Sequence, residues 1–564
     1  MELSDPVPSK GHGLGWRQAA LVAAVAVSWR LAYLGAACMA SDFFSPFLDA
    51  RWHVQWAEAV SRGHLLGSEA FFRAPLYPYA LGVLFALVGP NLLVARVVQI
   101  LVGSLAAVMV GLLGARLFGR QVGLLAGLLY ASAASLVVFD LELLVESLFV
   151  PLVVLALLAF ERAERAPSGV AAFGLGAALG LAAITRPNIL ALVPLAAAAL
   201  ALAAWRVGQR GARLLRTAAL FLIGLALPIA PVTLHNWVVS HDFDLIASQG
   251  GVNFYIGNSA EASGDESFMP GPTDMATYAA NGTYTDNVLS AGRFVAEQTE
   301  HRALKPSEVS GFWFGRAWAW IRGHPADWLR LTARKLFYLC GAFEIGDQRN
   351  LAATLESWRP LRYLPRWQWL APLALSGAVW PGERRGRAIL VSFLAVYAAT
   401  VVAFFVTERF RLALYPALCI LAARFVVATW HGVRHGQHRQ VLLHVALAAA
   451  VGVAIAGDPT GYTLGERAEA AAVRAQDAAR AGDMRAAEHA YIGALSLLGQ
   501  AASSRPTNLG GRVDLNALNR QVRRGYAALL AAQGRTAEAA MIAPAGVPPP
   551  RPEPAAREDS KSRR

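Results

Sequence analysis

The chain has 564 residues, of which 55% are hydrophobic and only 16% are charged. Soluble domains carry about a quarter charged residues, so this composition excludes an ordinary soluble protein and indicates an integral membrane protein. The net charge of +13 does not indicate nucleic-acid binding, because the basic residues fall at the ends of apolar segments and form no basic domain.

Apolar segments long enough to cross a bilayer recur along the chain. A membrane-spanning helix needs about 20 mostly apolar residues. We count eleven candidates, at about 18–40, 91–115, 121–139, 144–160, 169–185, 188–204, 216–237, 367–381, 388–406, 411–429 and 441–457. The sequence therefore predicts an all-α fold, a polytopic transmembrane helical bundle. The first segment exceeds the usual length of a signal-peptide core, so we expect an uncleaved signal anchor.

The distribution of arginine predicts which side of the membrane each loop faces. Arginines in short loops stay in the cytoplasm, and five short connections carry them, at 116–120, 162–165, 206–216, 384–387 and 434–439. All five are cytoplasmic if the N-terminus is too and if residues 76–89 form a re-entrant helix that does not cross. Residues 41–75, 238–366 and the tail from 458 then face outward. The Arg-rich and Ala-rich composition suggests a bacterial protein, so we expect the cytoplasmic membrane, with these segments in the periplasm.

The first of these outer loops is unusually charged for a chain this apolar. Ionisable residues at a membrane edge are costly and therefore indicate function. Asp49 stands close to Trp52 and Trp56, whose rings suit stacking on a sugar or a place among lipid headgroups. Charged residues from distant segments are predicted on the same side: Arg73, Glu142, Glu146, Arg186, Arg409 and Arg411. Each has a plainer interpretation, as an interface anchor or as half of a structural ion pair.

These residue types suit the transfer of a sugar from a lipid-borne phosphate. Such a reaction needs cations that hold the phosphate and a carboxylate that accepts a proton from the acceptor hydroxyl. Arginine binds phosphate oxygens bidentately and keeps its charge near lipid, and Asp49 suits the role of base. Alternatively, the same charges line the vestibule of a transporter or flippase for a lipid-linked or small polar substrate. A transporter usually shows internal repeats, and the first-loop pattern has no second copy.

Six segments of the chain carry a family resemblance. They are "LDARWHVQWAEAVSRG", "FRAPLYPYALGVLFALVG", "LELLVESLF", "ITRPNIL", "GGVNFYIGNSAEASG" and "ERFRLALYPAL". In this order they resemble the C-type membrane glycosyltransferases of glycosyltransferase family 39, which include protein O-mannosyltransferases and lipid A aminoarabinose transferases. The resemblance runs from about residue 18 to about 430. It implies inverting transfer of a hexose or pentose from an undecaprenyl-phosphate-linked donor to an acceptor protein, lipid or glycan.

The resemblance also implies roles for single residues. Asp49 is the catalytic base or adjoins it, Glu146 takes the position of a second catalytic acidic residue with Glu142 as its competitor, and Arg73 contacts the donor phosphate. Their charge predicts Arg186, Arg409 and Arg411 as further phosphate contacts. The predicted substrate contacts are His53, Tyr77, Asn253, Tyr255 and Asn258. Relatives often carry an Asp-Glu pair where Ala50 follows Asp49 here, which leaves a divalent metal open. Asp49 and His53 share a helix face, but two ligands do not make a site.

The sequence divides into a membrane domain and a tail. Residues 1–457 are predicted to form the transferase domain, with a first outer catalytic loop at 41–90 and a large outer loop at 238–366 that contains an interfacial amphipathic helix at 326–345. Residues 458–545 resemble tetratricopeptide hairpins suited to a protein partner, although Gly482 and Gly534 lie too far apart for the usual period of about 34 residues. A plain pair of Ala-rich helices is the alternative. Residues 546–564 are predicted to be disordered.

Overall fold

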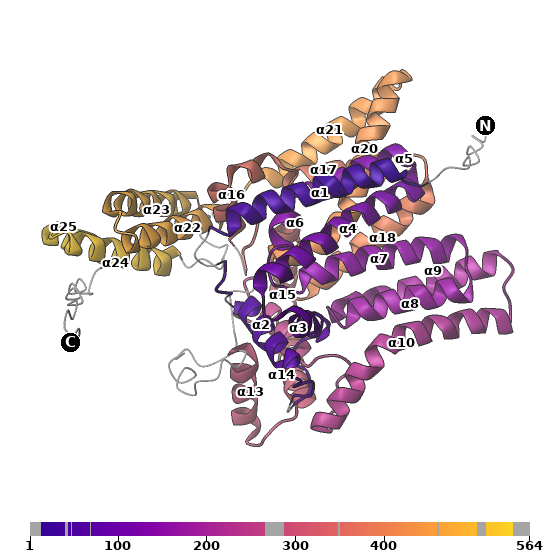
Figure 1. Cartoon of the computed structure of the whole chain (residues 1–564), viewed down its shortest axis with the longest axis horizontal. Helices are drawn as coiled ribbons and strands as arrows, with labels where there is room; N and C mark the ends of the chain where they lie inside the picture. Colours follow the sequence, from indigo (N-terminus) through magenta and orange to yellow (C-terminus); the bar gives the residue numbers. More distant parts are fainter. Residues whose placement is uncertain are drawn as a thin grey trace, which may run out of the picture. The chain divides into compact units, whose positions relative to one another are not determined.

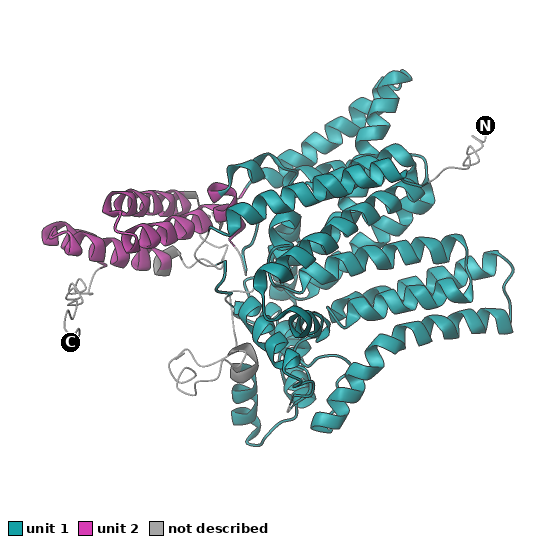
Figure 2. Ribbon diagram, viewed as in Figure 1, with its two compact units in different colours: residues 1–348, 358–457 teal, residues 349–357, 458–564 magenta. Residues whose placement is uncertain are grey.

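The computed structural model describes residues 13–39, 43–46, 48–67, 69–265, 287–347, 350–458, 462–504 and 515–544, and over these residues it contains helices and no strand. The chain forms two compact units (Figure 2). The first consists of residues 1–348 and 358–457, and the second of residues 349–357 and 458–564. Asp458, where the composition of the sequence changes, thus begins the main part of the second unit.

Long apolar helices make up most of the first unit (Figure 1). In the described part of the chain, seven helical stretches are long and apolar enough to cross a membrane: α1 (Trp16–Ala37), α4 (Leu92–Phe118), η1 with α9 (Pro187–Arg206), α10 (Ala212–Ser240), α18 (Arg384–Ala403), α19 to α20 (Glu408–Arg434) and α21 (His438–Ala456). Each coincides with a predicted crossing. The all-α polytopic membrane fold predicted from the sequence is confirmed.

The other four predicted crossings are shorter, interrupted or more charged. They correspond to α5 with α6 (Arg120–Ala131 and Ala134–Phe139), α7 (Glu146–Arg165), α8 (Gly169–Ala183) and α17 (Trp367–Val379). The break between α5 and α6 is satisfied inside the protein, because the Ala134 amide donates to the Pro365 carbonyl at 2.9 Å. Irregular backbone at membrane depth needs such a partner. The total of eleven crossings stays a prediction.

Glycine lets α8 and α10 approach each other closely. A Cβ added to Gly176 of α8 would lie 2.1 Å from the Phe221 carbonyl oxygen, and one added to Gly224 of α10 would lie 2.2 Å from the Phe173 carbonyl oxygen. Small residues at such crossings are the usual device for packing helices within lipid. α8 also packs against η1 (Pro187–Leu192), whose N-terminal neighbour is Arg186.

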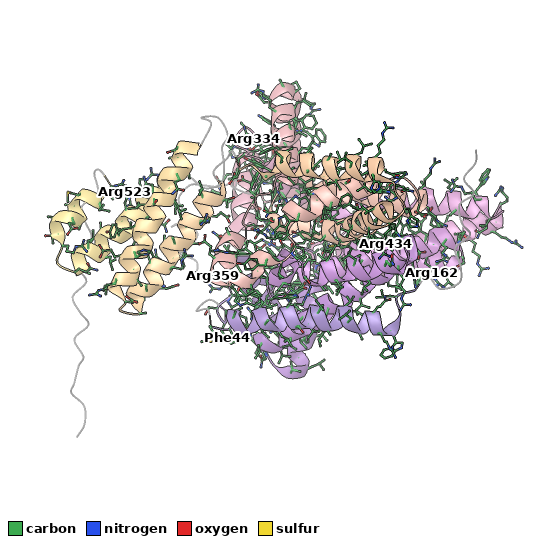
Figure 3. All side chains as sticks on the ribbon, turned by 90° about the horizontal axis from the view of Figure 1, so that it is seen from above. Phe44, Arg162, Arg334, Arg359, Arg434 and Arg523 are labelled. Atoms are coloured by element: carbon green, nitrogen blue, oxygen red, sulfur yellow. The ribbon has the colours of Figure 1, made fainter. Side chains whose placement is uncertain are left out.

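Residues predicted to face opposite sides of the membrane lie toward opposite ends of the first unit. Arg162 and Arg434, which belong to predicted cytoplasmic loops, lie toward one end, and Phe44, Arg334 and Arg359 lie toward the other (Figure 3). Which end faces the cytoplasm stays a prediction.

The first predicted outer loop folds into two short helices. α2 (Leu48–Ser61) and α3 (Leu76–Val88) pack together through an apolar cluster that includes Val54, Leu81 and Phe85 and extends to Leu143. At 13 residues α3 is shorter than the length needed to cross a bilayer. This packing holds α2, and with it Asp49, against the segment that joins α6 to α7.

The large polar segment contributes α11 (Gly250–Gly257), α13 (Asn287–Glu300), α14 (Pro306–Gly323), α15 (Pro325–Cys340), α16 (Leu351–Ser357) and η2 (Arg359–Tyr363). An aromatic cluster joins α11 and α14 to Phe405 and Phe410, and includes Tyr255 and Trp313. The predicted interfacial helix at 326–345 corresponds to α15, but Lys335 on it is buried and its side chain does not reach solvent.

The second unit contains α16 together with α22 (Tyr462–Arg480), α23 (Met484–Ser504), α24 (Leu515–Ala532) and α25 (Thr536–Ile542). Two helical hairpins turn at Gly482 and Gly534, whose φ angles of +82° and +78° favour glycine. Their core consists of alanines with Tyr491, Leu498 and Tyr526. The tetratricopeptide identity stays a prediction, and the predicted disordered tail at 546–564 lies outside the described residues.

Candidate functional site

Asp49, in the first turn of α2, contacts two arginines from distant parts of the chain. Its Oδ1 lies 2.8 Å from Arg73 Nη1, and its Oδ2 accepts a hydrogen bond from Arg409 Nη1 at 2.7 Å. Arg73 follows α2 in the first loop, whereas Arg409 lies 360 residues beyond Asp49, in α19 (Glu408–Arg411). The fold therefore brings together residues that the sequence alone does not relate.

These contacts decide the charge of Asp49. Burial alone would raise the pKa of its carboxyl group, but the Arg73 and Arg409 guanidiniums hold this pKa well below its usual range. Arg409 also forms an ion pair with Asp347 through its Nε atom. Asp49 is consequently a carboxylate at every physiological pH, neutralised by two guanidiniums.

A second pair lies where α7 and η1 begin. Glu146, the first residue of α7, forms an ion pair with Arg186, which precedes η1. The Arg186 guanidinium lies 4.4 Å from the ring centroid of Phe410, and the Arg409 guanidinium lies 5.2 Å from the same centroid. Phe410 therefore joins both pairs. We call Asp49, Arg73, Glu146, Arg186 and Arg409 the arginine–carboxylate cluster.

The segment between α6 and α7, residues 140–145, is held by polar side chains from neighbouring helices. Gln99 Nε2 donates to the carbonyls of Asp140 and Glu142, at 3.0 and 2.7 Å. Arg96 Nε donates to the Leu141 carbonyl at 3.0 Å. The Asp140 side chain pairs with fully buried Arg30 at 2.7 Å. Because non-helical backbone inside a membrane needs donors from the protein, these residues fix the turn that leads to Glu146.

His53 links this turn to the helix of Asp49. Its Nδ1 lies 3.1 Å from the Leu143 carbonyl oxygen. Its ring packs edge-on against the ring of Tyr77, with the two ring centroids 5.2 Å apart. Burial lowers the pKa of His53 to about 3, so the imidazole is neutral and Nδ1–H donates to Leu143. Tyr77 in turn donates to Gln99 Oε1 at 3.0 Å. Two predicted substrate contacts thus make contacts inside the protein, where they connect α2 and α3 to the 140–145 turn.

This geometry predicts opposite results for two substitutions of His53. Asn places an amide donor near the position of Nδ1, so His53→Asn is expected to keep activity within about threefold of wild type. Gln places the amide donor near the position of Nε2, so His53→Gln is expected to lower activity about tenfold, which is the usual effect of losing one buried hydrogen bond. The measurement is kcat and KM at several pH values. A group with a pKa near 3 does not titrate between about pH 5 and 8, so His53→Asn is expected to leave the shape of the pH profile unchanged over that range. A pH dependence present in wild type and lost in His53→Asn would show that His53 itself transfers the proton.

Arg411 does not join the cluster, although it was predicted to bind phosphate beside Arg409. It donates to the carbonyl of Phe343 at 3.0 Å and to that of Tyr338, and its guanidinium lies over Trp367. Its side chain is 1% exposed. Arg411 therefore satisfies the Tyr338 carbonyl in the last turn of α15, which a helix leaves without an internal partner, and the Phe343 carbonyl just beyond that helix.

Asn258 is also used inside the protein. Its Nδ2 donates to the carbonyls of Phe254 and Ala403, and its Oδ1 accepts from Trp328 Nε1 and from Lys335 Nζ at 3.1 Å. An amide side chain offers two donors and two acceptor positions, so the predicted hydrogen bond to a sugar has no atom left to make it. Burial lowers the pKa of Lys335 to about 7.

Three predicted residues remain: Glu142, Tyr255 and Asn253. Glu142 contributes its carbonyl to Gln99, Tyr255 packs on Trp313 with ring centroids 4.6 Å apart, and Asn253 is half-buried on α11. Their roles toward substrate stay predictions.

The cluster does not fit a divalent metal. Both Asp49 oxygens contact guanidiniums, and His53 Nδ1 faces a carbonyl. Among the residues that the structure describes, no group of three or more His, Cys, Asp or Glu side chains is arranged to hold a metal ion. We therefore derive no step through a metal.

Sequence reasoning did not single out Phe410, Asp347 or Gln99. Phe410 lies inside the motif "ERFRLALYPAL", but only the charge of its neighbours Arg409 and Arg411 indicated a function. Gln99 and Arg96 are polar residues three apart on one face of an otherwise apolar segment, which is the usual sign of a buried polar contact. Asp347 had no such signal.

Comparisons with known proteins agree with the resemblance. Residues 72–235 match the family described as dolichyl-phosphate-mannose-protein mannosyltransferase, and this segment contains Arg73, Glu146 and Arg186. The match confirms the resemblance to these glycosyltransferases over that segment. No curated protein matches the sequence.

Two solved structures are similar to the chain at low identity. The oligosaccharyltransferase of Archaeoglobus fulgidus in its apo form is 12% identical, with a TM-score of 0.41, over 80% of this chain and 57% of that one. ArnT from Cupriavidus metallidurans bound to undecaprenyl phosphate is 17% identical, with a TM-score of 0.33, over 73% of this chain and 78% of that one. The chain thus spans little more than half of the archaeal enzyme.

Proposed function

From the glycosyltransferase family match over residues 72–235, we propose that the chain is an inverting glycosyltransferase. It moves a sugar from a polyprenyl-phosphate donor to an acceptor hydroxyl at the outer face of the cytoplasmic membrane. The observation that carries the proposal is the arginine–carboxylate cluster. Two of its arginine side chains are partly exposed, at 20% for Arg73 and 17% for Arg186, so a ligand can reach them, whereas Arg409 is buried at 8%.

The arginines bind the donor phosphate. A guanidinium presents paired N–H donors that match two phosphate oxygens, and it keeps its charge in a site of low dielectric. As the bond between the anomeric carbon and the phosphate oxygen breaks, the phosphate gains negative charge. Cations already in place stabilise this charge in the transition state. The leaving group therefore needs no strong general acid.

Asp49 acts on the acceptor. The acceptor oxygen attacks the anomeric carbon from the face opposite the phosphate, which inverts the configuration, and its proton passes to the Asp49 carboxylate. The products are the glycosylated acceptor and polyprenyl phosphate. Glu146 holds Arg186 at the beginning of η1 and so positions one of the phosphate contacts.

An apolar groove along α10 suits the isoprenoid chain of the donor. It encloses about 1220 Å³, including space open to its surroundings, and is lined mainly by α10 residues with Leu190 of η1 and with Phe243 and Leu245. Leu190 lies one turn after Arg186. The loop that follows α10 hydrogen-bonds to the segment before Arg73, because the Ser248 amide donates to the Phe71 carbonyl at 3.0 Å. The groove thus adjoins segments that carry two of the arginines.

Filling the groove is expected to weaken binding of long-chain donors only. Ala226 lines the groove, and Ala226→Trp is expected to raise KM for an undecaprenyl donor by about tenfold. A tenfold weaker affinity corresponds to the free energy of burying roughly two methylene groups of the isoprenoid chain. A donor with a short polyprenyl chain should be nearly unaffected. Leu227→Trp on the same helix is the matched control, since Leu227 is 60% exposed and does not line the groove. Equal effects of both substitutions, or equal effects on both donors, would contradict this assignment.

The direct test of the function is transfer in membranes. Radiolabelled polyprenyl-phosphate sugars, both hexoses and pentoses, are supplied to membranes that contain the protein, and label is followed into protein, lipid and glycan fractions. Label should enter one of these fractions. Absence of transfer from every donor, together with label carried across proteoliposomes, would favour the transporter alternative.

A further inference from the structure

We propose that Asp49 takes the place of the donor phosphate in the donor-free protein, and that donor binding draws a guanidinium from Asp49 to the phosphate and so frees Asp49 to accept the acceptor proton. This inference rests on the proposed function and adds to it an order of events. In this order the same arginines first hold the base inactive and then hold the donor.

The Asp49 carboxylate lies between two arginine side chains, at a position that suits an anion. Each Asp49 oxygen contacts a different arginine, at 2.8 Å to Arg73 and 2.7 Å to Arg409. A carboxylate between two guanidiniums makes the contacts that phosphate makes in an arginine site. Arg73 is the arginine expected to move, because it is 20% exposed against 8% for Arg409, which Asp347 and Phe410 also hold.

In the second ion pair of the cluster, Glu146 with Arg186, one N–H donor has no acceptor among the described residues. Arg186 Nε and Glu146 Oε2 are buried and have no hydrogen-bond partner in the described part of the chain. A buried donor without a partner costs free energy that a ligand oxygen would recover. A phosphate near Phe410, which both Arg186 and Arg409 contact, would give the Arg186 donor an acceptor.

The exchange also resolves a chemical difficulty. A carboxylate that two guanidiniums stabilise is a poor proton acceptor, and the pKa of Asp49 is well below its usual range. Once the phosphate takes one guanidinium, less positive charge faces Asp49 and its affinity for a proton rises. The base therefore becomes active only when a donor is present, which protects the site from unproductive proton transfer.

Binding of undecaprenyl phosphate in detergent micelles tests the inference, because it needs no turnover. Asp49→Asn removes the competing anion and leaves the Arg73 and Arg409 guanidiniums without its charge, so we expect binding about tenfold tighter than in wild type. Glu69→Gln is the matched control: Glu69 pairs with Arg293 at 2.7 Å outside the cluster, and its removal should leave binding unchanged. Arg73→Gln should weaken binding.

The outcomes separate the inference from the proposed function. Unchanged or weaker binding in Asp49→Asn, with wild type binding normally, would overturn the inference and leave the glycosyltransferase in place. Absence of binding in wild type and in every variant would overturn both. Should Asp49→Asn fail to fold, wild-type kinetics give the answer: an unreactive acceptor analogue should inhibit uncompetitively toward the donor, and competitive or noncompetitive inhibition would contradict the order.

Discussion

Asp49→Asn is expected to lower kcat for sugar transfer by about 10² to 10⁴, the range in which a positioned general base contributes. Asn keeps the shape of the side chain and accepts hydrogen bonds, but it cannot take the acceptor proton. Transfer of radiolabelled sugar by purified protein in lipid vesicles measures the loss. KM for the donor should not rise, because the arginines remain.

The matched control for this variant is Glu58→Gln on the same helix. Glu58 pairs at 3.0 Å with Arg62, whose side chain is 68% exposed, so its removal changes a solvated contact only. Activity close to wild type is expected. Full activity in Asp49→Asn, with the control also active, would remove the catalytic assignment.

Arg409→Gln is expected to lower kcat/KM by about 10² to 10³, as loss of a preorganised donor to a developing negative charge usually does. Arg409 contacts Asp49, Asp347 and Phe410, so one substitution removes the proposed phosphate contact and releases two carboxylates. Arg409→Lys should recover little, because an ammonium cannot hold both carboxylates with a planar fork.

Stability must be measured beside activity for this variant. Leaving a buried charge without its partner costs about 3–5 kcal/mol, and a loss of that size lowers the unfolding temperature. Arg302→Gln is the control, since Arg302 pairs with Glu308 on the surface. A folded Arg409→Gln protein with normal donor affinity and normal kcat would contradict a role in phosphate binding.

The membrane fold could be predicted from the sequence because lipid imposes a simple rule. Every backbone polar group must be satisfied within its own helix, so long apolar runs become helices. Seven predicted crossings accordingly coincide with helices of spanning length. The predicted crossing at 121–139 follows this rule only in part, because the helix is interrupted after Ala131. There the Ala134 amide donates to the Pro365 carbonyl, outside its own helix.

The candidate site was predictable in its residue types and less so in its contacts. The sequence pointed to Asp49, Arg73, Glu146, Arg186 and Arg409, and the fold brings all five together. Their catalytic roles remain predictions. The pairing itself, across 360 residues for Asp49 and Arg409, depends on tertiary packing that no local pattern encodes.

The motif "ERFR" shows why local patterns treated two arginines alike. Arg409 and Arg411 are two residues apart, and residues at this spacing do not share a face of a helix. Arg409 therefore contacts Asp49, whereas Arg411 donates to the Tyr338 carbonyl in the last turn of α15 and to the Phe343 carbonyl beyond it. Local pattern was also insufficient for Asn258. Its polar side chain suggested a sugar contact, but all its hydrogen-bonding positions are used by groups within the protein.

The most direct test of the central claim is an experimental structure of the protein with undecaprenyl phosphate bound. The account predicts a phosphate within hydrogen-bond distance of Arg73 and of Arg409 or Arg186, with its isoprenoid chain along the groove of α10 and with Asp49 released from at least one guanidinium. A phosphate bound away from all three arginines, with Asp49 still held as in the free protein, would contradict it.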